Sequence, residues 1–414
     1  MDLQDRGALW RYLIGATAAR TGDELARPAL VLAGLAATGS ASAGPSLLAG
    51  LTIAAAIGGP ALGVLLDRSR RPGVVLALAL GGYATALAAV VVSLGTLPLA
   101  VALVPAVMGG LLASALSGGW AAQLPCVVPA SGLRRATSLD ALTFDLAGLA
   151  GPVIAGAVAL VAGASASVAV AVGLVVLSLP AALSLPARGP ATGPPTRAAR
   201  SVRADLVAGV RAIVRRGPLA RATATSTVSY LGVGLFTACL PLLGAEVFGA
   251  AAYGAILLSG VAAAALVTNA VLARFPHLAA PDTVLWASTL VLAAALFLAA
   301  TGVPALLVAA VLVAGVGDGP QLAALFAVRH REAPAHLRAQ VFTTGAGVKL
   351  GGFAVGAAVA VPAAEWSLPG ALVLGAGFEV LAVLTFVLTG GPVPALSRGD
   401  RGSSRTSDGR TARR

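Results

Sequence analysis

Acidic and basic side chains stand inside a long apolar segment near the start of this 414-residue chain. A helical step of about 100° per residue places Arg20, Asp23, Glu24 and Arg27 on one face. An ionised side chain at the centre of a bilayer costs about 2.5–3.5 kcal/mol, so few are kept without a use. We expect Arg20 to pair with Asp23 or Glu24, and Asp23 with Arg27. The cluster is either a self-neutralised structural unit or the wall of a water-filled cavity or a proton site. If the span begins later than residue 9, the four residues instead lie at the cytoplasmic interface.

A second set of charges falls in two segments that lie far apart in the sequence. Asp145 follows Arg134, and Lys349 follows Arg338, each by about eleven residues, which is roughly 16 Å along a helix and near the bilayer midplane. Lys349 is the chain's single lysine, and buried lysines lose their proton readily. An ion pair between Asp145 and Lys349 would form a gate or a binding site. A static buried pair, or separate partners, are the alternatives.

Asp318 stands within the run Gly315-Val-Gly-Asp-Gly-Pro320. The glycines and Pro320 are expected to weaken the helix and free backbone groups near the acid. The run is not a dinucleotide-binding motif, because no strand precedes it. Glu379 is a further candidate in the last apolar segment. His277, His330 and His336 are expected in loops, and no spacing among His and Cys residues predicts a metal site.

Apolar segments of helix length account for most of the chain. Hydrophobic residues make up 58% of it and charged residues 11%, which is too little polar surface for a soluble protein. Helices need roughly 17–25 residues to cross a bilayer. The sequence predicts an all-α polytopic membrane protein with twelve transmembrane helices, at 9–37, 47–66, 74–94, 99–122, 139–162, 167–185, 224–245, 253–273, 284–300, 303–328, 341–361 and 372–388.

Arginine is present in alternate breaks between these segments and absent from the others. Short basic loops stay on the cytoplasmic side of a membrane, and an even number of spans puts both termini there. The arginines behind the net charge of +12 are therefore expected to fix the orientation of the chain in a bacterial inner membrane. The expected partner is the lipid bilayer and not nucleic acid. The basic breaks are Arg68, Arg70 and Arg71, then Arg134 and Arg135, then Arg274, and finally Arg329, Arg331 and Arg338.

A basic stretch divides the spans into six and six. Residues 1–185 and 222–391 are predicted to form two six-helix bundles, joined by a cytoplasmic linker at 186–221 and followed by a disordered basic tail at 392–414. Residues 202–214 within the linker have the spacing of an amphipathic helix. A shift of about 204 residues superposes Arg134 on Arg338 and Asp145 on Lys349. Such parallel halves place a substrate site between them near the midplane.

Two motifs carry a family resemblance. Gly63-Val-Leu-Leu-Asp67-Arg68-Ser-Arg70-Arg71 resembles the loop signature Gly-x-x-x-Asp-Arg-x-Gly-Arg-Arg of the major facilitator superfamily, without the glycine before the last two arginines. The resemblance covers the whole span pattern. It implies two six-helix bundles that rock about a central cavity.

The second motif lies in the fifth predicted span. Gly148-Leu-Ala-Gly151-Pro152-Val-Ile-Ala-Gly156 is similar to the superfamily's antiporter signature, with alanine at the penultimate glycine. This similarity implies a drug or metabolite exporter. The span at 99–122 departs from many drug/proton antiporters because it contains no arginine.

The residues of both motifs also have direct physical consequences. Gly63 allows a neighbouring helix to come close. Asp67 is able to accept hydrogen bonds or to pair with an arginine where the loop meets the neighbouring bundle, in a contact that forms in one state and breaks in another. The arginines alone would be explained by anchoring. Pro152 removes a backbone hydrogen bond, so its helix is either thin and bendable or simply tightly packed.

The sequence therefore predicts a secondary transporter that exports a small organic compound in exchange for protons. It is expected to act as a monomer in the lipid bilayer and to need no cofactor. Candidate proton carriers are Asp23, Glu24, Asp145 and Asp318, with Lys349 as their charge partner. No phosphate loop, zinc motif or nucleophile elbow is present, so no enzymatic activity is expected. An uptake symporter and a non-transporting membrane scaffold or sensor remain as alternatives.

Overall fold

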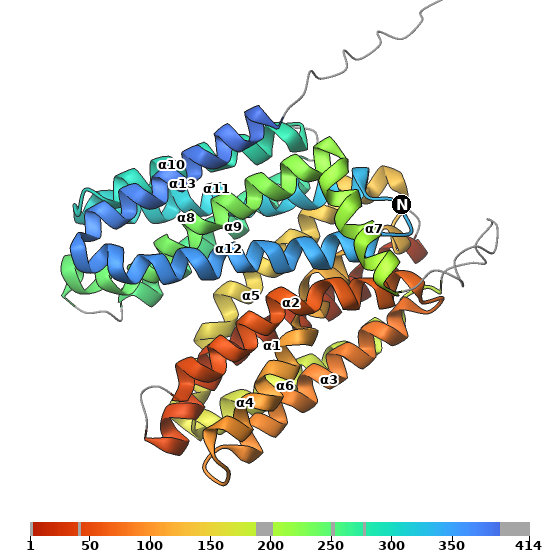
Figure 1. Cartoon of the computed structure of the whole chain (residues 1–414), viewed down its shortest axis with the longest axis horizontal. Coiled ribbons are helices and arrows are strands. Elements are labelled where there is room, and N and C mark those ends of the chain that lie inside the picture. Colours follow the sequence, from red (N-terminus) through yellow and green to blue (C-terminus); the bar gives the residue numbers. More distant parts are fainter. Residues whose placement is uncertain (1–2, 40–42, 188–201, 250–252, 276–278, 390–414) are drawn as a thin grey trace, which may run out of the picture.

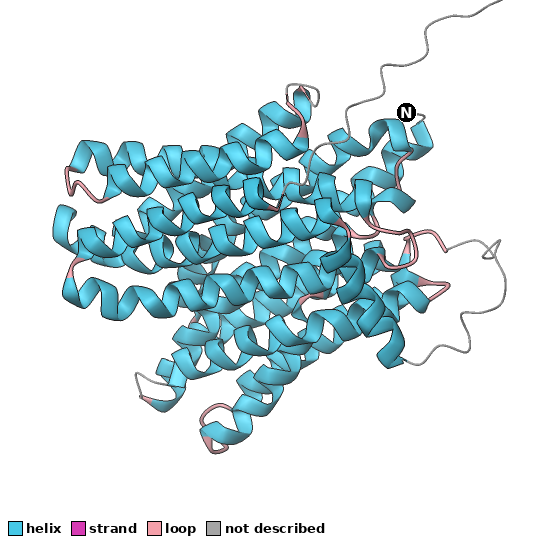
Figure 2. Cartoon of the chain, turned by 45° about the horizontal axis from the view of Figure 1, so that its top comes forward, coloured by secondary structure: helices cyan, strands magenta, loops and turns pink. Residues whose placement is uncertain are grey.

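The computed structural model describes residues 3–39, 43–187, 202–249, 253–275 and 279–389. These residues form α-helices joined by short turns, and no strand occurs among them (Figure 2). The first half comprises α1 (Leu3–Thr38), α2 (Ala43–Arg68), α3 (Pro72–Ser93), α4 (Leu99–Ala113), α5 (Leu133–Ala162) and α6 (Ala164–Leu183). Helix α7 (Val202–Arg215) follows, and the second half comprises α8 (Gly217–Phe248), α9 (Tyr253–Arg274), α10 (Pro281–Ala299), α11 (Pro304–Glu332), α12 (Arg338–Trp366) and α13 (Leu368–Leu388).

Twelve of these helices form two six-helix bundles, α1–α6 and α8–α13, which confirms the predicted fold class (Figure 1). Eleven are long and apolar enough to span a membrane by length and composition. Helix α1 falls outside that group because of its charged residues, and it packs against α5 and α6 as a member of the first bundle. Large side chains such as Leu160 and Trp366, each 90% exposed, cover the outside of the bundles, where lipid is their natural solvent.

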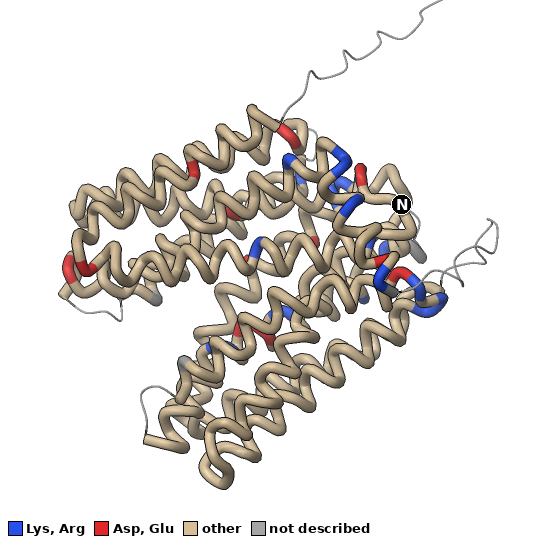
Figure 3. The backbone as a smooth tube through the Cα atoms, viewed as in Figure 1, with Lys and Arg blue, Asp and Glu red and all other residues tan. Residues whose placement is uncertain are grey.

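The two bundles meet at one end of the molecule and diverge toward the other (Figure 1). Basic residues gather at the end where they meet, which we call the basic end (Figure 3). Glycines allow the backbones of α2 and α12 to touch there: a Cβ atom added at Gly59 would overlap the Thr343 carbonyl, and one at Gly63 would overlap Gln340. The predicted close approach at Gly63 is confirmed, with α12 of the other half as the neighbour.

Helix α11 differs from its prediction in two ways. It runs without a break through Gly315 and Pro320, and it ends only at Glu332. The glycines make room for α9 and do not interrupt the helix: a Cβ at Gly315 would overlap the Val261 carbonyl. The later end carries Arg329 and His330 into the helix, where both are buried, so their assignment to a loop is wrong.

The linker and the tail are described only in part. A helix is observed at Val202–Arg215, where an amphipathic helix is predicted at 202–214. Helix α8 already begins at Gly217, so the linker ends earlier than predicted. His277, most of the predicted linker's first half and the predicted tail at 392–414 lie outside the described residues.

Candidate functional site

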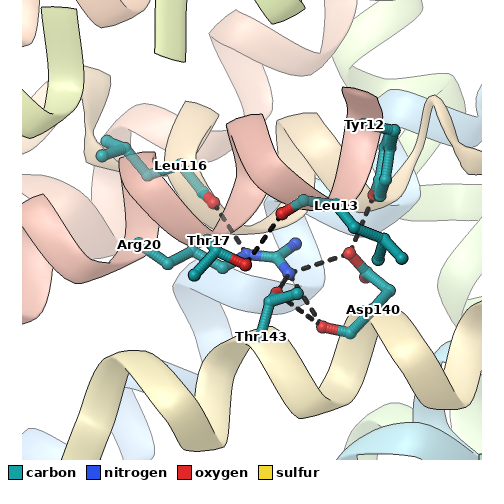
Figure 4. A network of polar contacts seen from close by, with 7 residues as sticks. All are labelled: Tyr12, Leu13, Thr17, Arg20, Leu116, Asp140 and Thr143. Atoms are coloured by element: carbon teal, nitrogen blue, oxygen red, sulfur yellow. Dashed lines mark hydrogen bonds and ion pairs between the residues drawn. The ribbon is translucent and has the colours of Figure 1, made fainter. Parts of the chain in front are cut away.

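Arg20 of α1 forms the centre of a buried network in the first half (Figure 4). Its Nη1 donates to the Asp140 carboxylate (2.8 Å), to the Asp140 carbonyl (2.9 Å) and to the Thr143 hydroxyl. Its Nε donates to the Leu116 carbonyl (3.2 Å), and the Tyr12 hydroxyl donates to Asp140 (2.9 Å). The ion pair ties α1 to α5, and its two side chains are 2% and 0% exposed.

The predicted pairing of Arg20 with Asp23 or Glu24 is therefore wrong, whereas the pairing of Asp23 with Arg27 is confirmed. Arg27 reaches the carboxylates of Asp23 (2.8 Å) and Glu24 (2.9 Å). Helical side chains lean toward the helix N-terminus, so Arg27 approaches the two acids that precede it while Arg20 turns away from them. The Tyr83 hydroxyl of α3 also donates to Asp23 (2.6 Å).

A second set of polar groups lies where the two halves meet. The Asn269 amide of α9 donates to the Asp145 carboxylate of α5 (2.6 Å). The Tyr230 hydroxyl of α8 donates to Asp318 of α11 (3.3 Å), and the Lys349 ammonium of α12 lies 3.6 Å from the centre of the Tyr230 ring. We call these five residues the junction cluster. They come from five helices, and Asp145 brings the first half into contact with the second.

Asp145 and Lys349 do not form a direct ion pair: among the described residues, none of the nitrogen–oxygen distances between them is within 4.0 Å. The Asp145 carboxylate accepts a hydrogen bond from Asn269 instead, and the Lys349 ammonium forms a cation–π contact with the Tyr230 ring. Both Asp145 and Asp318 still interact electrostatically with Lys349. The predicted pair is thus replaced by one cation that two carboxylates influence electrostatically, and each carboxylate accepts a hydrogen bond from a neutral donor.

The loop signature joins the halves at the basic end. The Asp67 carboxylate accepts the backbone N–H groups of Ala339 (3.0 Å) and Gln340 (2.9 Å) in the first turn of α12. A carboxylate at a helix N-terminus accepts hydrogen bonds from the free N–H groups there, and its negative charge is attracted to the positive end of the helix dipole. Arg68 pairs with Asp205 of α7 (2.7 Å), and Arg70 and Arg71 are exposed. Asp67 therefore holds α12 against α2 while the basic end is closed.

The antiporter-like motif of α5 contributes mainly one close contact. A Cβ added at Gly151 would lie 2.8 Å from the Glu24 Cβ and the Leu25 nitrogen of α1, whereas one at Gly148 or Gly156 would meet nothing within 4 Å. Pro152 lies inside the continuous helix. Tight packing accounts for Gly151, and nothing in the structure explains Gly148 or Gly156.

Glu379 of α13 belongs to a separate hydrogen-bonded group within the second half. The Ser229 hydroxyl donates to its carboxylate (2.6 Å), and the Gln321 amide donates to Ser229 (2.9 Å). Glu379 is 0% exposed. Among the described residues, no group of three or more His, Cys, Asp or Glu side chains is placed to hold a metal ion.

Arg329 is a buried cation that the sequence suggests only as a loop anchor. It is 1% exposed, and none of its three guanidinium nitrogens has a hydrogen-bond partner in the described structure. His330 beside it is 6% exposed and also has both ring nitrogens without a partner. The guanidinium is packed so closely on α12 that a Cβ at Gly345 would overlap it. The guanidinium carbon lies 5.8 Å from the centre of the Phe342 ring, but no carboxylate pairs with Arg329 among the described residues, and a buried charge without a counter-ion is destabilising.

Replacing Arg329 by methionine is expected to raise the free energy of unfolding by about 1–4 kcal/mol, because the apolar side chain removes the uncompensated charge. Denaturant-induced unfolding in detergent measures the change. The matched control is Arg331→Met, since Arg331 is 44% exposed and pairs with Asp282 and Glu332. That control should lower the stability by no more than about 1 kcal/mol. A loss of stability in Arg329→Met would contradict the interpretation.

Comparisons with known proteins agree with this architecture. The model of the family described as Major Facilitator Superfamily matches residues 12–357. The human organic anion transporter MFSD10 (TETRAN) superposes with a TM-score of 0.77 at 16% identity, covering 93% of this chain and 100% of that one. The Escherichia coli fucose:proton symporter FucP gives 0.71 at 14% identity, with 94% and 100% covered. A bacterial homologue of the iron transporter ferroportin, in an outward-facing state, gives 0.71 at 15%, with 92% and 99% covered. No curated protein matches by sequence.

Proposed function

Because the chain belongs to the major facilitator superfamily, we propose that it exports a small organic compound by alternating access, in exchange for protons. The family and the multi-pass architecture establish a membrane transporter. The direction of transport, the coupling ion and the class of substrate are the proposal. It is supported by the ionisable groups of the membrane-spanning helices and by the closed contact at the basic end.

The junction cluster is the observation that carries the proposal. Ionised side chains in transmembrane helices are costly, and they mark ion and substrate pathways. Asp145 comes from the first half, whereas Asp318 and Lys349 come from the second, and the two carboxylates interact with the one ammonium. Glu24 of α1 also acts electrostatically on Tyr230. Asp145 and Asp318 act on Lys349 together with the cation Arg329, whereas Asp23 and Glu24 share Arg27. Lys349 and Arg27 are thus each placed near two carboxylates, which supports the uptake and release of protons, with Asp23, Glu24, Asp145 and Asp318 as carriers.

The conformational part of the proposal rests on Asp67. We assign the basic end to the cytoplasm of a bacterial cell with an inner membrane, because short arginine-bearing loops are retained there; both termini then lie on that side. Protons entering from the opposite, open end neutralise the junction carboxylates. The bonds from Asp67 to α12 then break, the basic end opens, and the compound binds from the cytoplasm after the protons leave.

An uptake symporter is the second candidate, and the fold similarity to the fucose:proton symporter favours it. The two directions are separated with membrane vesicles. Growth inhibition of an export-deficient host first identifies a compound against which the gene protects, starting from tetraphenylphosphonium as an organic cation and benzoate as an organic anion. The radiolabelled compound is then offered to everted and to right-side-out vesicles.

Export predicts accumulation in everted vesicles that are acidic inside, and loss of that accumulation when a protonophore is added. Accumulation in right-side-out vesicles alone would instead establish uptake. Protection without any proton-dependent movement in either orientation would refute the proposed coupling. No protection and no transport of either probe would favour the scaffold or sensor.

A further inference from the structure

Helix α7 lies across the basic end and contacts both halves: α2 on one side, and α8 and α12 on the other. Asp205 pairs with Arg68 of α2 (2.7 Å), and the Leu206 carbonyl accepts the Gln340 side-chain amide of α12 (3.0 Å). Gly209 lies so close to Gln340 that a Cβ there would overlap its amide group. Helix α7 can therefore make all of these contacts only while α2 and α12 lie side by side.

A groove of about 440 Å³ runs between the outward face of α7 and Pro60 of α2. Its floor is apolar, with Val207, Val210 and Val214 being 54%, 47% and 67% exposed. Arg211 and Arg215 line the same groove. Both are exposed, and neither has an ion-pair partner among the described residues. The groove thus combines an apolar surface with two cations that no carboxylate in the described part of the chain neutralises.

We propose that this groove binds an anionic phospholipid, with an acyl chain against the valines and Pro60 and the phosphate between Arg211 and Arg215. Guanidinium groups bind phosphate oxygens with paired, charge-assisted hydrogen bonds. Amphipathic helices with arginine on the polar side lie at the headgroup level of membranes, where anionic lipids are attracted to basic residues. The charge of the groove and its apolar floor match the two parts of such a lipid.

The position of α7 gives the lipid a conformational effect. A lipid that fills the groove between α7 and α2 adds contacts to the arrangement in which α7 bridges α2 and α12. Ligands shift a conformational equilibrium toward the state that they bind better. Anionic lipid therefore favours the state in which the basic end is closed.

Native mass spectrometry of the full purified chain in detergent tests the site. Phosphatidylglycerol and phosphatidylcholine with identical acyl chains are titrated into the wild type, into Arg211→Gln/Arg215→Gln, and into Arg203→Gln/Arg274→Gln. The last variant removes the same charge from exposed positions outside the groove. Each basic residue near an anionic surface contributes about 1 kcal/mol, so the first double variant should bind phosphatidylglycerol about tenfold or more weakly.

The expected result is a preference of the wild type and of the control for phosphatidylglycerol, and loss of that preference in Arg211→Gln/Arg215→Gln. The variant Arg211→Lys/Arg215→Lys should keep most of the binding, which separates loss of charge from damage to α7. Val207→Ser/Val210→Ser should weaken lipid binding, and soluble glycerol phosphate should not compete. Equal affinity of the wild type for both lipids, equal loss in the control, or full competition by glycerol phosphate would overturn the proposal. None of these outcomes depends on export or on proton coupling.

Discussion

Replacing Arg20 by methionine is expected to lower the free energy of unfolding by about 3–5 kcal/mol, because the substitution leaves the Asp140 carboxylate buried without its cation. The two side chains are 2% and 0% exposed and lie 2.8 Å apart. After the substitution, Asp140 keeps only the Tyr12 hydroxyl among the side-chain donors described above. Equilibrium unfolding in a mixed-detergent series measures the loss.

Two further variants isolate the cause. Arg20→Met/Asp140→Leu removes both charges and should recover most of the stability, since replacing a whole buried pair by apolar residues is often neutral. Arg11→Met is the matched control on the same helix: Arg11 is exposed and has no ion pair among the described residues, so its loss should change the stability by about 0.5 kcal/mol or less. A double variant as unstable as Arg20→Met would show that the pair is not the reason for the loss.

Neutralising the junction cluster is expected to stop transport while leaving the fold intact. Asp145→Asn keeps the shape of the side chain and an acceptor for Asn269, and Lys349→Met keeps its length. Each substitution should slow transport of the compound identified by growth protection by about tenfold or more. This corresponds to a rise of about 1.4 kcal/mol or more in the activation free energy of transport. Initial rates in vesicles, normalised to the amount of protein in the membrane, measure the effect.

Glu246→Gln serves as the control for this experiment, because Glu246 is an exposed acid near the end of α8. It should transport at the rate of the wild type. The proposed role of the junction cluster would fail if Asp145→Asn and Lys349→Met both transported the compound as fast as this control does.

Much of the fold follows from the sequence because apolar composition and length decide which segments cross a bilayer. The two bundles, the amphipathic helix and the close approach at Gly63 are all predictable in this way. A contact of Asp67 across the two halves is predictable, but its donors, the N–H groups of Ala339 and Gln340 at the start of α12, are known only from the structure. Helix ends are less so: α5 begins at Leu133, before the predicted 139, because polar residues at an interface continue a helix as readily as they end it.

The partners of the buried charges could not be read from the chain. The spacing along α1 allows Asp23 to pair with Arg20 as well as with Arg27. Only the packing of α1 on α5 brings Asp140 to Arg20 as its partner. Asn269 escaped prediction because it carries no charge, although an amide inside an apolar span is itself a signal of an interhelical hydrogen bond. Arg329 gave a misleading signal, since an arginine near the end of a span usually serves as an anchor.

Distances across the basic end provide the most direct test of alternating access in this chain. Spin labels are attached at Arg70→Cys and Ala335→Cys, two exposed positions in the turns after α2 and α11, with Cys126 and Cys239 replaced by serine. Pulsed electron–electron double resonance should give one short distance for the wild type. A second, longer distance should appear in Asp67→Asn, which weakens the contact with α12, and in Asp145→Asn, which mimics the protonated carboxyl. A single unchanged distance in all three proteins would contradict the account.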